Sequence, residues 1–328
     1  MGGRFPLGGV MDKPFLSIDD QISLLANRGV EPTPSQSTAL MRDGYYSIVN
    51  GYKDAFIDVE ASAVADDDRF MVGTSFDDIY NLFKFDRSLR ALTFQSIIKA
   101  EALVRTAVAY TFASAHREHD SYLLQESYCS REEYSRYNRG GSPYADELSG
   151  LISILRRVRD KNDAEFVAHY RNEHGSVPIW VLCNALTFGN IQHFFNLMKP
   201  EEKQSVCKMI VEATGRKGGR LLGYFDVQEA RISLEVLVKF RNLCAHDERL
   251  YCAHVGSRKN IGFDKMVWML ERYLPDNEFC DYLLGLAGLL EDYLKTSDQG
   301  AHVLNQLGFP AMIVKIANRV AALEKMGS

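Results

Sequence analysis

The stretch Lys239-Phe-Arg-Asn-Leu-Cys-Ala-His-Asp-Glu-Arg249 decides the fold prediction, because it ends a long segment of apolar residues at helical spacing. A helix turns by about 100° per residue, so Asn242 and His246 lie at positions i and i+4 and share one face. Arg241 lies about 100° from Asn242 and about 140° from His246. The apolar residues of this segment fall mostly on the opposite side: Val236, Leu237, Phe240 and Leu243. The pattern predicts a helix whose C-terminal end presents three polar side chains together.

These three side chains suffice for metal-free cleavage of RNA. The arginine offers a fixed fork of donors that matches a phosphate, and the histidine changes charge near neutral pH. The histidine would transfer the proton of the ribose 2′-hydroxyl or of the leaving group, a role that contributes roughly 10²–10⁴-fold in rate. The arginine would stabilise charge on the phosphate in the transition state. The amide would hold the substrate or the imidazole in place.

Two other interpretations of the same residues stay open. Arg241 and His246 could hold phosphates without cleaving them, as in an RNA-binding or RNA-sensing protein. They could also form a buried polar network in a protein-interaction scaffold. An arginine with a histidine five residues later is also a frequent chance pattern, as Arg249 and His254 show, and a histidine at a helix C-terminus interacts favourably with the helix dipole.

The pattern Arg-Asn-x-x-x-His resembles the signature of the HEPN superfamily of RNases. The longer run from Arg241 to Tyr251 resembles the Abi-like, or abortive infection, branch of that superfamily. Further segments resemble motifs of this branch in the same order along the chain. They are residues 13–21, 25–29, 44–52, 85–90 with Glu101 and Arg105, 178–180, 186–189 and 307–310.

The resemblance implies an all-α protein built on a HEPN-type bundle of four main helices, with additional N- and C-terminal helices. It implies a metal-independent endoribonuclease that acts in antiphage defence by abortive infection, in the manner of a toxin. His246 would be the general acid/base, Arg241 would bind phosphate, and Asn242 would orient His246 or the substrate. Since the chain holds a single convincing motif, we expect a homodimer with a composite site. The resemblance also implies RNA as substrate and a restraining partner such as a cognate small structured RNA or another antitoxin.

The composition is that of an ordinary soluble globular protein, with 328 residues, 46% of them hydrophobic and 25% charged. No run approaches the roughly 20 apolar residues of a membrane span, and no secretory signal is visible, so we expect a cytoplasmic protein without membrane contact. The resemblance to an antiphage family implies that the protein is prokaryotic. The six cysteines have no Cys-x-x-Cys spacing and indicate reduced thiols. We expect no metal and no cofactor.

The net charge of −5 does not exclude RNA binding, because a local basic patch suffices. One candidate patch contains Arg156 and Arg157, and another contains Arg216, Lys217 and Arg220. Each is also consistent with a solvated helix face or a turn.

Two further arginines lie in the segment from residue 79 to about residue 115, which is predicted to form one or two long helices. Arg90 and Arg105 could point at the active cleft, or they could form ion pairs, since Glu101 stands four residues before Arg105. Ser75 and Asp78 predict a capping box at the start of this segment.

The helical and polar segments together predict three parts. Residues 1–70 form an N-terminal helical segment, residues 71–255 a HEPN-like core, and residues 256–328 a set of C-terminal helices. The polar, tyrosine-rich residues 127–142 are predicted to form a loop.

Overall fold

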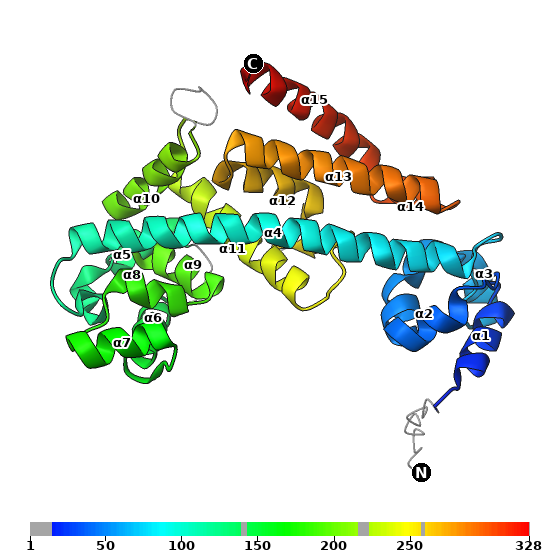
Figure 1. Cartoon of the computed structure of the whole chain (residues 1–328), viewed down its shortest axis with the longest axis horizontal. Helices are drawn as coiled ribbons and strands as arrows, with labels where there is room; N and C mark the ends of the chain where they lie inside the picture. The colour runs from blue at the N-terminus through cyan, green and yellow to red at the C-terminus, as the bar shows by residue number, and fades with distance from the viewer. Residues whose placement is uncertain (1–14, 139–142, 216–222, 257–259, 328) are drawn as a thin grey trace, which may run out of the picture. The chain divides into compact units, whose positions relative to one another are not determined.

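The computed structural model describes residues 15–138, 143–215, 223–256 and 260–327, and its regular structure is almost entirely helical (Figure 1). Their one sheet is a short antiparallel pair in which His254 lies opposite Gly262. The all-α prediction is therefore confirmed.

The described chain divides into two compact units. Unit 1 contains residues 15–85 and 291–306, and unit 2 contains residues 86–290 and 307–327. The predicted division at residues 70 and 255 stays a prediction, because a compact unit need not be a domain that folds alone.

Unit 1 contains the capped start of the long helix α4 and joins an early and a late segment of the chain. The predicted capping box is present: Ser75 Oγ donates to the Asp78 carboxylate at 2.6 Å, and Asp78 N donates to Ser75 Oγ at 3.2 Å. The same carboxylate accepts a hydrogen bond from Ser297 Oγ at 2.7 Å, which ties the late segment of this unit to its early one. The helices that contribute to unit 1 are α1 (Ile18–Asn27), α2 (Gln36–Asp43), η1 (Tyr46–Asn50), η2 (Lys53–Phe56), α3 (Val59–Ala65), the start of α4 (Phe76–Ala115), the end of α13 (Asp276–Thr296) and α14 (Gly300–Gln306).

Unit 2 holds the motif and most of the remaining helices. They are the rest of α4, η3 (Ser121–Leu123), η4 (Gln125–Ser127), α5 (Arg131–Tyr137), α6 (Tyr144–Lys161), α7 (Glu165–His174), α8 (Ile179–Leu182), η5 (Cys183–Ala185), α9 (Phe188–Leu197), α10 (Pro200–Ala213), α11 (Val227–Ala245), α12 (Phe263–Leu270), η6 (Glu271–Tyr273), the start of α13 and α15 (Phe309–Gly327). The short strands β1 (His254–Val255) and β2 (Ile261–Gly262) follow α11.

One prediction about this unit is wrong. Within the segment 127–142 that was expected to be a loop, residues Arg131–Tyr137 form α5. Ser130 begins the helix with a capping box, in which Glu133 N donates to Ser130 Oγ at 3.2 Å and Ser130 N donates to Glu133 Oε2 at 2.8 Å. This local cap pairs two backbone N–H groups at the start of the helix, and it therefore favours a helix within a polar, tyrosine-rich segment.

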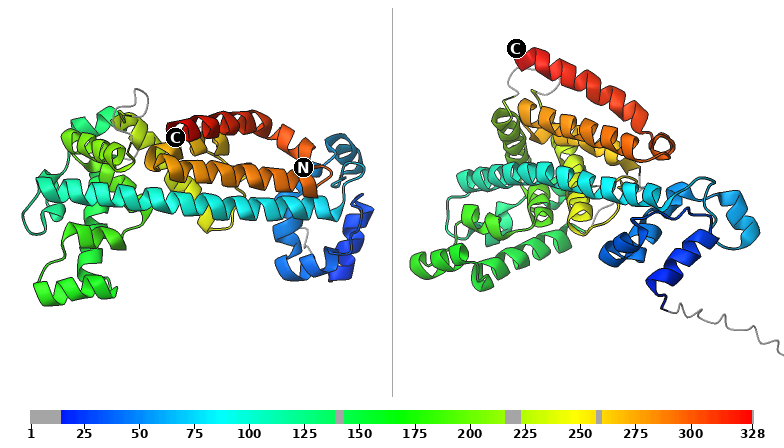
Figure 2. Two further views of the ribbon diagram at one scale, coloured as in Figure 1. Left: turned by 45° about the horizontal axis from the view of Figure 1, so that its top comes forward. Right: turned by 45° about the vertical axis from the view of Figure 1, so that its right-hand side comes forward.

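Helix α11 carries the motif and is anchored along its length. Asp226 caps its start by accepting hydrogen bonds from the backbone N–H groups of Gln228 at 2.8 Å and Glu229 at 3.1 Å. Its buried side packs against α9 and α12, and Figure 2 shows α11 passing beside α4. Of the predicted apolar face, Val236, Leu237 and Phe240 are buried, whereas Leu243 in the last turn is half-buried. Because that face is fixed in the core, the opposite face at the helix end is held toward solvent.

Candidate functional site

The three motif residues lie at one helix end. Arg241 and Asn242 belong to the last turn of α11, and His246 is its C-cap. The backbone N–H of His246 donates to the carbonyl of Asn242 at 2.9 Å, which continues the helical spacing up to the histidine. Asn242 and His246 are exposed, whereas Arg241 is half-buried.

The side chains of Asn242 and His246 make no hydrogen bond or ion pair within the described residues. Both imidazole nitrogens of His246 are therefore open to a ligand or to water. A histidine in this state can accept and release a proton without first breaking a contact inside the protein.

The chain turns sharply just after His246. Asp247 adopts a left-handed conformation with φ of 57°, and Glu248 N donates to the carbonyl of Leu243 at 3.0 Å. This is the Schellman type of helix ending, with aspartate at the position that glycine usually occupies. Left-handed conformations of residues other than glycine cost about 1–2 kcal/mol, and such strain is common at functional sites.

A buried carboxylate on α4 holds the segment that follows the motif. Asp86 is fully buried, and its Oδ1 accepts hydrogen bonds from Tyr251 N at 2.7 Å and Leu250 N at 3.1 Å. Its Oδ2 accepts from Arg90 Nη1 at 2.5 Å. Asp86 thus satisfies two backbone donors that would otherwise be buried without a partner.

Arg90 extends this anchor back toward the histidine. Its side chain is only 4% exposed, and its Nη1 also donates to the Glu248 carbonyl at 3.3 Å. Its Nη2 pairs with the carboxylate of Asp247, the residue in the left-handed conformation. Arg90 therefore fixes the turn that follows His246, and its geometry favours the ion-pair alternative given for it above.

Arg241 faces a second carboxylate of α4. Its Nε lies 3.4 Å from Glu101 Oε2, and its guanidinium carbon lies 5.6 Å from the centre of the Phe94 ring. Neither Nε nor Oε2 makes a hydrogen bond among the described residues, so the contact is an ion pair without a hydrogen bond. The guanidinium is oriented by Glu101 along one edge and by the Phe94 ring beneath it.

Glu101 also holds Arg105. Arg105 Nη2 donates to Glu101 Oε1 at 2.6 Å and lies 3.4 Å from the Leu186 carbonyl. The Glu101 side chain is 8% exposed, so a single buried carboxylate lies between two guanidinium groups. The predicted i,i+4 pair of Glu101 and Arg105 is present, and it is coupled to the motif.

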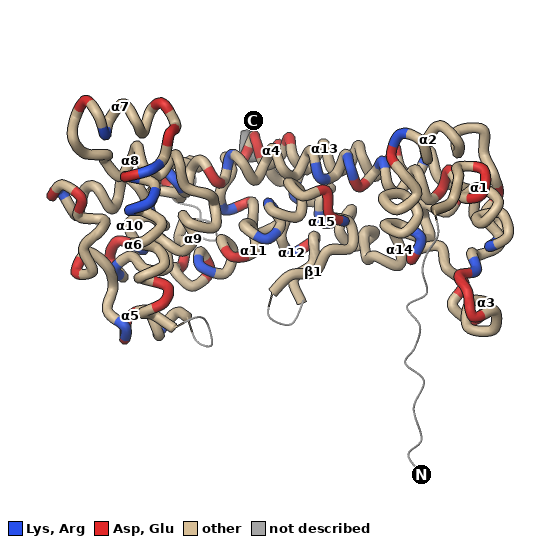
Figure 3. The backbone as a smooth tube through the Cα atoms, turned by 90° about the horizontal axis from the view of Figure 1, so that it is seen from below, with Lys and Arg blue, Asp and Glu red and all other residues tan. Residues whose placement is uncertain are grey.

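The other predicted RNA-binding residues lie apart from this arrangement. Arg156 and Arg157 are exposed near the end of α6, and no contact links them to the motif. Arg216, Lys217 and Arg220 lie outside the described residues. Figure 3 shows acidic and basic positions interspersed along most of the helices, apart from an acidic run at residues 66–68 after α3.

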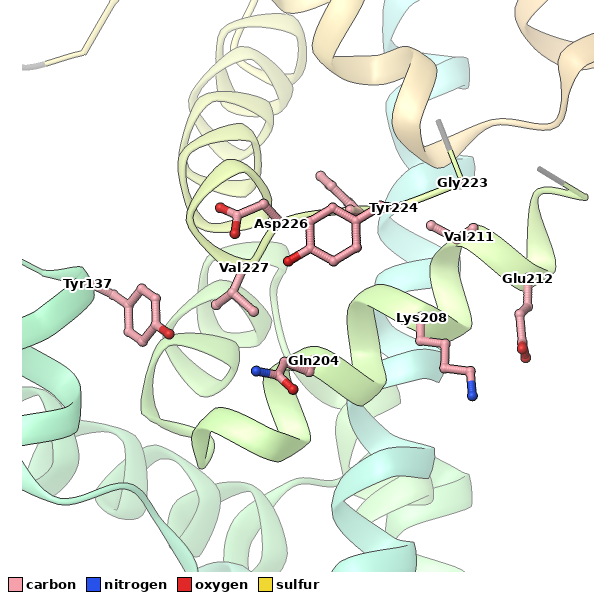
Figure 4. A pocket seen from close by; sticks show the side chains of 10 residues that line it. Tyr137, Gln204, Lys208, Val211, Glu212, Gly223, Tyr224, Asp226 and Val227 are labelled. Atoms are coloured by element: carbon pink, nitrogen blue, oxygen red, sulfur yellow. The ribbon is translucent and has the colours of Figure 1, made fainter. Parts of the chain in front are cut away.

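A pocket of about 640 Å³ lies between α10 and the start of α11. Tyr137, Lys208 and Tyr224 project toward it, as Figure 4 shows. None of the predicted site residues lines this pocket.

The described residues show neither a metal-binding cluster nor a membrane-spanning helix. In the part of the chain that the structure describes, no three His, Cys, Asp or Glu residues are placed to hold a metal ion. All six cysteines are free thiols. Of the helices with described positions, none has the length and apolar character to cross a bilayer.

Three elements of the site were not inferred from the sequence. They are the anchoring role of Asp86, the contact between Glu101 and Arg241, and the left-handed turn at Asp247. A signal for the first two was present, because α4 carries two acid–base pairs at i,i+4 spacing, Asp86 with Arg90 and Glu101 with Arg105.

Comparison with known proteins identifies a family to which the chain is similar. The family described as Abi-like protein matches residues 38–252, which is more than half of the chain and includes the whole motif. Neither the curated proteins nor the solved structures contain a significant match. An abortive-infection type of function is what this family suggests. The chain belongs to the Abi-like protein family.

Proposed function

We propose that this protein is a metal-independent endoribonuclease of the HEPN type that acts in abortive infection. The observation that carries the proposal is the pairing of an unengaged histidine with an oriented arginine. His246 is exposed without a partner among the described residues, while Arg241 is held by Glu101 and Phe94 at the same helix end. These are the proton-transfer group and the phosphate-binding group that RNA cleavage needs.

The proposed reaction uses the ribose 2′-hydroxyl as nucleophile. His246 removes the proton from the 2′-hydroxyl, the 2′-oxygen attacks phosphorus, and the bond from phosphorus to the 5′-oxygen breaks. The departing 5′-oxygen takes up a proton, so the products carry a 2′,3′-cyclic phosphate and a 5′-hydroxyl. Arg241 stabilises the charge that develops on the non-bridging oxygens.

One motif supplies one imidazole, whereas the reaction needs a base and an acid. A homodimer that brings two motifs into one cleft would supply both, together with a second arginine. Such a nuclease also needs restraint before infection, and a cognate small structured RNA or another antitoxin is the proposed restraining partner.

The test is cleavage of total RNA and of a short oligonucleotide in EDTA by wild-type, Arg241→Ala and His246→Ala proteins. We expect wild type to leave 2′,3′-cyclic phosphate ends and both variants to lose cleavage. His119→Ala is the matched control, because His119 is also exposed and has no partner among the described residues.

Two results would overturn the proposal in different ways. If the wild-type protein cuts no RNA and all three proteins bind RNA equally, the protein is a non-catalytic RNA-binding protein. A large loss of thermal stability in His246→Ala would indicate a structural network instead. The exposure of His246 predicts a change within about 0.5 kcal/mol.

A further inference from the structure

A second pocket lies on α4, one turn beyond the carboxylate that holds Arg241. It has a volume of about 500 Å³ and is lined by residues of α4 and of the segment around α8. The lining residues are Arg105, Thr106, Ala109, Tyr110, Ala113, Ser114, Trp180 and Asn184. We call this pocket the α4–α8 groove.

Two large aromatic side chains of the groove are exposed to solvent. Tyr110 is 65% exposed and Trp180 is 56% exposed. Trp180 belongs to α8, whose other residues Ile179, Val181 and Leu182 are buried, so the backbone beneath the indole is firmly held. Rigid aromatic faces of this kind are platforms on which unpaired nucleobases stack.

The charge of the groove favours a polyanion. Among the described residues that line it, Arg105 is the only charged one and none is a carboxylate. Arg105 uses Nη2 to bind Glu101, and its Nη1 makes no hydrogen bond within the described residues. The Nη1 amino group of a half-buried guanidinium is therefore left for a ligand.

The groove is continuous with the candidate catalytic site. Glu101 pairs with Arg241 on one side and with Arg105 on the other. From Glu101 to Tyr110 the rise along α4 is about 13 Å, a distance that a few nucleotides of an extended single strand would span.

We propose that the α4–α8 groove binds unpaired nucleobases of single-stranded RNA next to the scissile phosphate, by stacking on Trp180 and Tyr110. This inference rests on the proposed function and gives that site a substrate class, RNA without base pairing. A second copy of the chain fits the groove less well. In a two-fold pairing the same patch faces itself, which would place one Arg105 against another and bury like charges together.

The binding test uses a full-length protein with a single tryptophan. The chain has two tryptophans, so Trp268→Phe leaves Trp180 as the only indole reporter, and His246→Ala prevents cleavage during the titration. The probes are an adenosine hexamer and an abasic hexamer that has the same ribose and phosphate groups without bases. We expect saturable quenching of Trp180 fluorescence by the adenosine hexamer and little change with the abasic one.

Affinity is then compared by anisotropy of a fluorescein-labelled adenosine hexamer, with His246→Ala as the parent. Trp180→Ala and Tyr110→Ala are expected to weaken binding by roughly 5- to 100-fold each, the range for one stacked base. Tyr224→Ala is the matched control, because Tyr224 is 73% exposed but lines the other pocket. Melting temperatures should stay within about 2 °C of the parent, since these side chains lie outside the core.

The proposal is overturned if Trp180→Ala and Tyr110→Ala bind the adenosine hexamer within twofold of the parent. It is also overturned if the abasic hexamer quenches as strongly, or if Trp180→Ala changes the sedimentation of the protein and leaves RNA binding unchanged. The last result would assign the groove to an interface between copies. Failure of the proposed RNA-cleaving function would look different. In that case the wild-type protein would cut no RNA, but the adenosine hexamer would still quench Trp180 more strongly than the abasic hexamer.

Discussion

Replacing Asp86 with asparagine tests whether the turn after His246 is held from α4. The carboxylate is fully buried and accepts hydrogen bonds from Arg90 Nη1, Leu250 N and Tyr251 N. Asparagine has nearly the same shape but keeps only one acceptor oxygen. Whichever oxygen is retained, the new amide N–H₂ faces either the Arg90 guanidinium or the Tyr251 N–H, and that donor loses its acceptor.

The expected loss of unfolding free energy is about 3 kcal/mol. Breaking a buried ion pair costs about 3–5 kcal/mol when the remaining partner is left uncompensated. Here the lower end applies, because Arg90 retains the carboxylate of Asp247 and the carbonyl of Glu248. Each kcal/mol lowers the melting temperature of a protein of 150–250 residues by about 2–4 °C, so for about 3 kcal/mol we expect a decrease of roughly 6–12 °C.

The assay is thermal unfolding of wild-type and variant proteins, followed by circular dichroism, together with RNA cleavage well below the melting temperature. Cleavage should fall as well, because the freed turn carries His246. Asp281→Asn is the control, since Asp281 is exposed on α13 and has no partner among the described residues. If Asp86→Asn melts within about 1 °C of Asp281→Asn, Asp86 does not anchor the turn and the reasoning is refuted.

Two further predictions concern other carboxylates of α4. Glu101→Gln should lower kcat of RNA cleavage with little rise in KM, because Arg241 keeps its place but loses the negative charge 3.4 Å from its Nε. An unchanged kcat would show that Glu101 does not orient Arg241. Burial of Asp78 opposes its ionisation, but hydrogen bonds from Ser75 and Ser297 outweigh burial and lower the pKa of Asp78. This stabilisation is present above the unfolded pKa of about 3.9 and is lost as pH falls through the lower folded pKa. Urea unfolding at pH 5 and pH 3 should therefore show a smaller acid-induced loss of stability in Asp78→Asn, and an equal loss in both proteins would contradict the role of Asp78.

The predictable parts of the fold were those that depend on neighbours in the sequence. The capping box at Ser75 and the apolar stripe of α11 each act over a few residues, and both are present. The missed helix α5 has the same kind of local signal in Ser130 and Glu133, but the polar composition around it favoured a loop. Local chemistry decided the structure there, and average composition did not.

The candidate site depends on contacts that a single sequence does not encode locally. Asp86 and Leu250 stand 164 positions apart, yet the carboxylate of one holds the backbone of the other. Spacing rules placed Asn242 and His246 on one side of a helix, but they contain no information about which acidic side chain lies beside Arg241. The left-handed turn at Asp247 was not predicted either, since its stabilising partner Arg90 stands 157 positions away in the sequence.

The two anchors divide the site into a fixed part and a free part. Asp86 and Arg90 hold the backbone that follows His246, and Glu101 holds the guanidinium of Arg241. No described residue holds the imidazole itself. General acid–base catalysis needs an imidazole within hydrogen-bond reach of the proton that it moves, and many catalytic hydrogen bonds form only when substrate is bound. The backbone after His246 is fixed and the imidazole is free, so the imidazole must be aligned by a bound ligand or by a second copy of the motif. For this reason the dimer and the RNA strand belong to the same proposal.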